Sequence, residues 1–131
     1  MKVDHIGIAT PSIEEGLSLW QEALGLTPDS AEEVAEQGVK VCMLPLGDTH
    51  VELLEPLSPD SAVGKFLAKR GPGIHHIAVE VADIHQSLAQ LKQRGARLID
   101  ETPRVGAGGS LIAFVHPSFT NGVLLELVQH Q

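Results

Sequence analysis

The segment Asp-His-Ile-Gly-Ile-Ala at residues 4–9 returns in altered form as His-His-Ile-Ala-Val-Glu at residues 75–80. Both segments alternate in the way that is typical of a β-strand. Each is followed by a helical pattern that ends at a glycine, Gly25 in the first half and Gly95 in the second. An internal repeat of this kind indicates one supersecondary unit that is used twice.

The other expected elements follow a similar order in both halves. In the first half we expect strands at 2–9, 39–46 and 50–54, helices at 12–25 and 61–69, and an irregular acidic connection at 29–36. In the second half we expect strands at 74–81, 97–100, 111–116 and 123–129, with a helix between Asp83 and Gly95. We therefore predict a single α+β domain over residues 1–131, in which two tandem β-α-β-β-β modules, at about 1–70 and 73–131, form a curled mixed sheet.

Composition and charge exclude several classes of function. The chain is 43% hydrophobic, and its length suits one domain with a core of its own. Nine basic against 17 acidic residues give a net charge of −8, which argues against nucleic acid or an anionic membrane as partner. Cys42 is the single cysteine, and the N-terminal residues lack the pattern of a signal peptide. We therefore expect a cytoplasmic protein without membrane spans.

Each half carries one histidine on its first strand and one glutamate on its last strand. The pairs are His5 with Glu52 and His76 with Glu126, at nearly equal separations along the chain. A carboxylate buried without a partner costs several kcal/mol. A lone histidine on a strand is more often structural, and a lone glutamate often faces solvent, but neither reading explains why the same pair occurs twice. We therefore predict that the four side chains converge on one cation, around which the sheet curls.

The donor types narrow the choice of ion. Two imidazoles and two carboxylates suit one divalent ion per subunit, for which we expect cobalt first, with zinc, nickel, manganese or iron as alternatives. Four protein ligands on an octahedral ion leave two positions open, as a catalytic metal site requires.

The ligands and the segments that connect them resemble the vicinal oxygen chelate superfamily, which includes glyoxalase I, extradiol dioxygenases and the methylmalonyl-CoA epimerase family. The resemblance to the epimerases is the sharper one and covers essentially the whole chain. The segments that carry it are residues 4–9, 36–39 (Glu-Gln-Gly-Val), 51–56 (Val-Glu-Leu-Leu-Glu-Pro), 73–80 (Gly-Ile-His-His-Ile-Ala-Val-Glu), 106–109 (Gly-Ala-Gly-Gly), 116–117 (His-Pro) and 122–127 (Gly-Val-Leu-Leu-Glu-Leu).

This resemblance implies an enzyme that interconverts (2R)- and (2S)-methylmalonyl-CoA by 1,1-proton transfer through a metal-chelated enolate. Glu52 and Glu126 are the implied proton carriers on the two faces of the substrate. Gly108 and Gly109 are expected to let the thioester approach the backbone, and His116 is a further candidate for a substrate contact. The expected partners are a small acyl-CoA and a second copy of the chain in a homodimer.

The chain departs from some epimerases at one position. Those proteins carry a glutamate where this chain has Val41, and a glutamine where it has Glu52. If the hairpin turns around Gly47 and Asp48, residue 52 lies opposite Met43 and diagonal to Val41, about 7–8 Å away on the same face. Our hypothesis is that Glu52 combines labile metal ligation with proton transfer, while Glu126 serves the opposite face.

Two other functions stay open at this point. One is a lactoylglutathione lyase of the glyoxalase I type, which would use the same ligands. The other is a metal-free, non-catalytic protein that binds an antibiotic-like small molecule.

For the phosphates of coenzyme A, the sequence offers four candidate cations without selecting among them, Lys65, Lys69, Arg70 and Arg104. Of the remaining side chains, Trp20 is expected in the core, His75 in a structural role and His130 in solvent.

Overall fold

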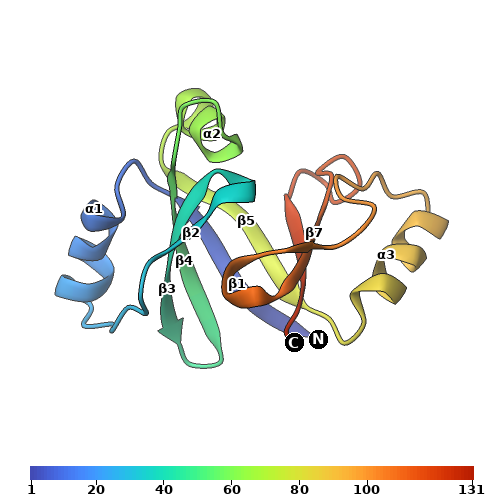
Figure 1. The fold of residues 1–131 in the computed structure, drawn as a ribbon, viewed down its shortest axis with the longest axis horizontal. Coiled ribbons are helices and arrows are strands. Elements are labelled where there is room, and N and C mark those ends of the chain that lie inside the picture. The colour runs from blue at the N-terminus through green and yellow to red at the C-terminus, as the bar shows by residue number, and fades with distance from the viewer. The chain divides into compact units, whose positions relative to one another are not determined.

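The computed structural model describes residues 1–131, which form two compact units. We call residues 5–75 the first unit, and residues 1–4 together with 76–131 the second unit. Strand β1 (Lys2–Ala9) contributes to both units, because the division falls between Asp4 and His5. Figure 1 shows the ribbon, in which the three α-helices and most of the strands are labelled.

The first unit is a mixed sheet with helices attached. Its strands pair in the order β2 (Glu32–Val34), β3 (Val39–Leu46), β4 (Thr49–Pro56) and β1. Strand β1 runs parallel to β4, and the other pairs are antiparallel. The helical segments are α1 (Ile13–Leu17), η1 (Ser18–Ala23), η2 (Ala35–Gln37) and α2 (Ala62–Arg70). A core of buried apolar residues forms around Leu44 and Leu53.

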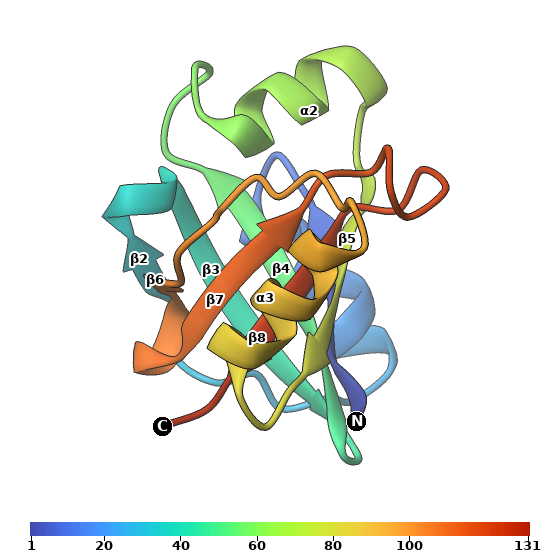
Figure 2. The ribbon, with the colours of Figure 1, turned by 90° about the vertical axis from the view of Figure 1, so that its right-hand side faces the viewer.

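The second unit repeats this pattern. Its strands pair in the order β5 (Gly73–Glu80), β8 (Leu125–Gln129), β7 (Leu111–Val115) and β6 (Arg104–Val105). Strand β5 runs parallel to β8, and the other pairs are antiparallel. Helix α3 (Ile84–Gln93) lies against β7 and β8 (Figure 2). The short turn η3 (Ala107–Gly109) precedes β7.

The α+β class is confirmed, and in both halves the module's first strand runs parallel to its last. The physical reason is that the first strand, helix and last strand share one apolar layer in each unit. Buried Ile13 on α1 packs with Leu53 on β4, and buried Ile84 on α3 packs with Leu127 on β8. The sequence repeat therefore reflects a repeat of packing.

The first helix is less regular than its sequence predicts. Ser12 caps it as expected, because its side chain accepts a hydrogen bond from the Glu15 backbone amide. Beyond Leu17 the helix widens into the π-helical turn η1, which changes the residue spacing of the apolar stripe. As a result Leu24 is 60% exposed, and Trp20, which packs against the core of the first unit as expected, is only half-buried.

Two connections also differ from the expectation. The acidic segment at 29–36 contains strand β2, which adds to the edge of the sheet beside β3. The expected strand at 97–100 is reduced to one bridge between Leu98 and Val115. There the Asp100 carboxylate accepts a hydrogen bond from the Phe114 backbone amide, so a side chain takes the place of further ladder pairing.

No helix in the structure combines the length and apolar character that a bilayer span would require.

Candidate metal centre

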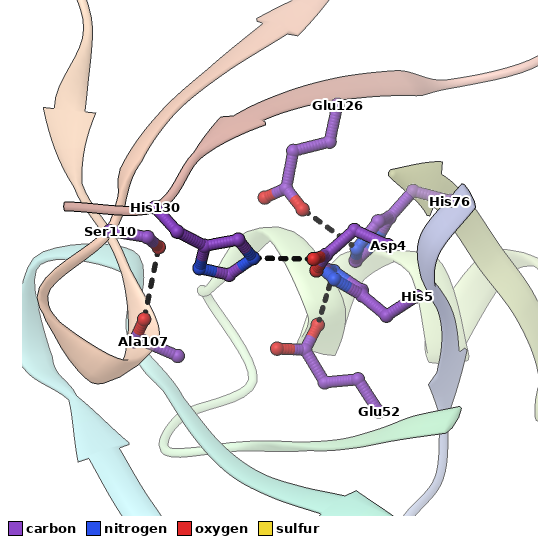
Figure 3. Close-up of polar contacts among 8 residues, drawn as sticks. All are labelled: Asp4, His5, Glu52, His76, Ala107, Ser110, Glu126 and His130. Atoms are coloured by element: carbon purple, nitrogen blue, oxygen red, sulfur yellow. Dashed lines mark hydrogen bonds and ion pairs between the residues drawn. The ribbon is translucent and has the colours of Figure 1, made fainter. Parts of the chain in front are cut away.

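The first histidine–glutamate pair forms within the first unit. His5 on β1 and Glu52 on β4 come from adjacent parallel strands, in which Gly7 is the residue opposite Glu52. The His5 Nε2 atom lies 3.3 Å from Glu52 Oε1 (Figure 3). Both residues are buried, at 4% and 5% exposure. An imidazole and a carboxylate are thus held together away from bulk water.

The second pair has the same construction within the second unit. His76 on β5 and Glu126 on β8 again come from adjacent parallel strands, and Ala78 is the residue opposite Glu126. The His76 Nε2 atom lies 3.4 Å from Glu126 Oε1 (Figure 3). The Phe114 ring packs against the His76 ring in a T-shaped arrangement, with 5.5 Å between the ring centroids. In both units a small residue two positions after the histidine faces the glutamate.

The geometry of each pair fits two ligands of one ion. Nitrogen and oxygen ligands lie about 2.1 Å from zinc-like ions, so two such ligands are about 3.0 Å apart at a right angle and about 3.4 Å apart at a tetrahedral angle. The observed separations of 3.3 and 3.4 Å match this range. Imidazole nitrogen and carboxylate oxygen are donors that divalent ions of borderline hardness accept. Each pair therefore offers two candidate ligands for a metal ion within its own unit.

The hairpin around Gly47 and Asp48 has the expected register. Met43 pairs with Glu52 and Val41 pairs with Leu54, so Val41 is the diagonal neighbour of Glu52. Val41 is 4% exposed. At this position the chain has a buried apolar side chain and no second carboxylate.

The three expected substrate-contact residues lie in two turns of the second unit. Gly108 and Gly109 belong to η3 and have φ angles of +67° and +79°, which a residue with a Cβ rarely adopts. His116 directly follows β7. The Ser118 backbone amide donates a hydrogen bond to His116 Nδ1 at 3.0 Å. Because Nδ1 is the acceptor, the proton of the neutral ring is on Nε2.

Sequence reasoning missed one contact beside the first ligand. His130 is exposed as expected, but its Nε2 atom also pairs with Oδ1 of the buried Asp4. The next residue, Gln131, donates a hydrogen bond from Nε2 to the Gly109 carbonyl oxygen at 2.9 Å. No local pattern could have revealed the contact between His130 and Asp4, because 126 positions separate the two residues along the chain.

The family match and the similar proteins of known name agree with one another. Residues 4–114 match the Glyoxalase/Bleomycin resistance protein/Dioxygenase superfamily. The chain is 39% identical to the mitochondrial methylmalonyl-CoA epimerase of Dictyostelium discoideum, over 96% of this chain and 76% of that protein. It is 37% identical to the ethylmalonyl-CoA/methylmalonyl-CoA epimerase of Cereibacter sphaeroides, over 98% of this chain and 97% of that protein.

Solved structures agree with these relatives. A variant of the Streptomyces coelicolor methylmalonyl-CoA epimerase, in complex with 2-nitronate-propionyl-CoA, matches with a TM-score of 0.95 and 40% identity. The match covers 98% of this chain and 94% of that chain. The lactoylglutathione lyase of Neisseria meningitidis is a more distant relative, at 23% identity over 98% of this chain.

Proposed function

Because this chain belongs to the Glyoxalase/Bleomycin resistance protein/Dioxygenase superfamily, and within it to the methylmalonyl-CoA epimerases, we propose that it interconverts (2R)- and (2S)-methylmalonyl-CoA. The observation that carries the proposal is the buried histidine–glutamate pair that occurs once in each unit. Epimerisation at a carbon next to a thioester requires charge stabilisation and proton transfer on two faces. Two imidazoles and two carboxylates provide the side chains for both tasks.

We propose that His5, Glu52, His76 and Glu126 hold one divalent metal ion. Support comes from the donor types and from the separation within each pair, which suits neighbouring ligands of one ion. When bound, such an ion supplies Lewis-acid chemistry, because it stabilises the negative charge that develops on the thioester oxygen as the C2 proton leaves. Within the range that these donors allow, we propose cobalt as the native ion.

The two glutamates are the proposed proton carriers. Glu126 takes the C2 proton of one epimer on a carboxylate oxygen, and Glu52 returns a proton from the opposite face. The reverse reaction exchanges these roles. Their burial supports this assignment, since bulk water is kept from competing for the proton. Val41 supports it as well, since the position diagonal to Glu52 has no carboxylate of its own.

The two turns of the second unit are the proposed substrate contacts. His116 would donate a hydrogen bond from Nε2 to a substrate oxygen, since Ser118 already occupies Nδ1. Gly108 and Gly109 would let the thioester approach the backbone, because neither carries a side chain.

We further propose a cytoplasmic homodimer. Exposed apolar side chains such as Ile74, at 64% exposure, support the dimer, and the unpaired, buried thiol of Cys42 fits a reducing compartment.

The test is proton exchange at C2, followed by NMR of methylmalonyl-CoA in deuterated solvent. The wild-type protein should exchange the C2 proton of both epimers, while Glu52→Gln and Glu126→Gln should each lose exchange from at least one epimer. Glu101→Gln, at an exposed glutamate, is the matched control and should behave as wild type. Exchange at the wild-type rate from both epimers in Glu52→Gln would refute the two-glutamate scheme. Turnover of the methylglyoxal–glutathione adduct instead of methylmalonyl-CoA would favour the lyase.

A further inference from the structure

Helix α2 carries an unusual concentration of positive charge for this acidic protein. Lys65, Lys69 and Arg70 are three of the nine lysines and arginines in a chain of net charge −8. Residues 61–79 contain no aspartate or glutamate. All three side chains are exposed, and we call them the basic face of α2. This segment therefore has a local charge opposite to that of the whole chain.

The three cations of the basic face differ from the other candidate, Arg104, in whether a carboxylate pairs with them. The Arg104 Nε atom lies 3.0 Å from Asp100 Oδ1, so a carboxylate already neutralises its charge. Lys2 and Lys92 are likewise paired, with Glu80 and Glu101 respectively. None of the three cations of the basic face forms an ion pair. Of the four cations that the sequence offers for phosphate binding, only these three keep their charge available.

The basic face is held in place by local packing. Arg70 lies over the Phe66 ring at 5.7 Å, and the same ring contacts His75 edge-on at 5.0 Å. Gly64 packs so tightly that an added Cβ would come within 2.5 Å of the Ser58 carbonyl oxygen. Helix α2 also contacts β4, the strand that carries Glu52. The three cations therefore sit on an anchored helix in the same unit as one of the proposed ligand pairs.

We propose that the basic face of α2 binds the phosphates at the nucleotide end of the acyl-CoA substrate. This inference rests on the proposed function. It assigns a binding site to the nucleotide part of the substrate, while the reacting acyl group remains with the buried glutamates. A phosphate monoester carries about −1.5 to −2 charges at neutral pH, so coenzyme A is strongly anionic. A protein of charge −8 repels such a substrate unless a local positive surface attracts it.

An alternative explanation is that Lys69 and Arg70 only stabilise the C-terminal end of α2 through the helix dipole. Helix α3 provides the matched control, because its last turn contains Lys92 and is followed by Arg94 and Arg97. The substitution Lys65→Ala/Lys69→Ala/Arg70→Ala therefore removes the same charge as Lys92→Ala/Arg94→Ala/Arg97→Ala. Thermal unfolding of both variants shows whether either one has lost its fold.

The experiment compares methylmalonyl-CoA with methylmalonyl-pantetheine, which keeps the thioester and lacks the phosphates. For the basic-face variant, kcat/KM with methylmalonyl-CoA should fall about five- to tenfold, mainly through KM, because three exposed charge contacts to the phosphates are lost. With methylmalonyl-pantetheine the same variant should match wild type, and the α3 variant should match wild type with both substrates. An equal loss with both thioesters, or no loss with either, overturns the proposal.

A binding measurement keeps this inference separate from the proposed function. Adenosine 3′,5′-bisphosphate should bind the wild-type protein and the α3 variant, and should bind the basic-face variant at least several-fold more weakly. Its binding to wild type should weaken as salt is added, because salt screens exposed charges. If wild type turns over neither thioester, the proposed function fails while this titration still tests the basic face. If adenosine 3′,5′-bisphosphate binds all three proteins equally, the basic face does not bind the phosphates, whether or not the protein is an active epimerase. If the triple variant does not fold, Lys69→Glu alone is used in its place.

Discussion

The Ile13 backbone amide donates a 2.8 Å hydrogen bond to Glu55 Oε1, which joins the start of α1 to the strand that carries Glu52. The same relationship recurs in the second unit, where the Ile84 amide donates a 2.8 Å hydrogen bond to Gln129 Oε1. Glu55 and Gln129 each follow the proposed ligand glutamate by three residues. In both units a side chain of the last strand thus satisfies one of the free amides at a helix start.

We expect Glu55→Ala and Gln129→Ala each to lower the free energy of unfolding by about 1–2 kcal/mol, because each leaves a partly buried amide without its acceptor. The measurement is urea unfolding followed by circular dichroism. Glu15→Ala, at an exposed glutamate of α1, is the control and should change stability by less. An unfolding midpoint identical to wild type in Glu55→Ala would show that the bond contributes nothing.

Removal of either imidazole should weaken metal binding to a similar extent, because His5 and His76 hold equivalent positions in the two units. We expect His5→Ala and His76→Ala each to lose at least about 10–100-fold in metal affinity. Metal content by mass spectrometry and titration of the metal-free protein give the values. His85→Ala, on the exposed side of α3, should bind metal as wild type does. Unchanged affinity in either of the first two variants would contradict the four-ligand site.

Removal of the metal should also lower thermal stability. A ligand that binds only the folded state stabilises it, and a buried carboxylate that lacks its cation remains desolvated without compensation. After treatment with a chelator, the Tm should fall, and it should recover when cobalt or another divalent ion is restored. The double variant His5→Ala/His76→Ala serves as the control, since chelator should leave its Tm unchanged. A wild-type Tm that is insensitive to chelator would count against a resident ion.

The diagonal relationship between Val41 and Glu52 allows an exchange of roles. The variant Val41→Glu/Glu52→Gln should regain C2 exchange that Glu52→Gln alone has lost, because the new carboxylate lies on the same face of the hairpin. Val41→Glu alone should lower stability by about 2 kcal/mol or more, since it adds a carboxylate at a 4% exposed position. NMR of the C2 proton tests the first statement and urea unfolding the second. A double variant as inactive as Glu52→Gln would show that position 41 cannot supply the proton.

The Cys42 thiol should react slowly with thiol reagents in the folded protein. Burial is the main cause that raises the pKa of Cys42, and the nearby Asp29 raises it further. A raised pKa means that less reactive thiolate is present at pH 8 than in a free cysteine. The rate of reaction with Ellman's reagent should therefore be low in buffer and ordinary in urea. Fast labelling of the folded protein would show that the thiol is accessible.

The repeat was sufficient to predict much of the fold from sequence. Strand β3 has the predicted bounds, and the register that places Met43 opposite Glu52 is confirmed, because turn chemistry at Gly47 fixes the hairpin. His5 lies beside Glu52 and His76 lies beside Glu126, while the convergence of all four side chains on one cation stays a prediction. The family assignment is confirmed by relatives that match over 96% and 98% of this chain.

The sequence could not predict features that depend on competition between local and long-range contacts. The π-helical turn after Leu17 has no residue pattern of its own, so the exposure of Leu24 was not foreseeable. Strand β2 is acidic and exposed, and it forms because β3 offers an open edge. The contact between His130 and Asp4 joins opposite ends of the chain, where local patterns carry no information.

Strand β1 is fixed by contacts at two consecutive residues, since His130 holds Asp4 and Glu52 holds His5. A single residue inserted into or deleted from β1 would move Asp4 or His5 away from its partner. It would also turn the His5 side chain to the other face of the strand. The apolar side chains at neighbouring positions such as Val3 and Ile6 have no specific polar partner to keep. Across related lineages, this first strand should therefore exchange side chains freely at those positions while its length stays constant.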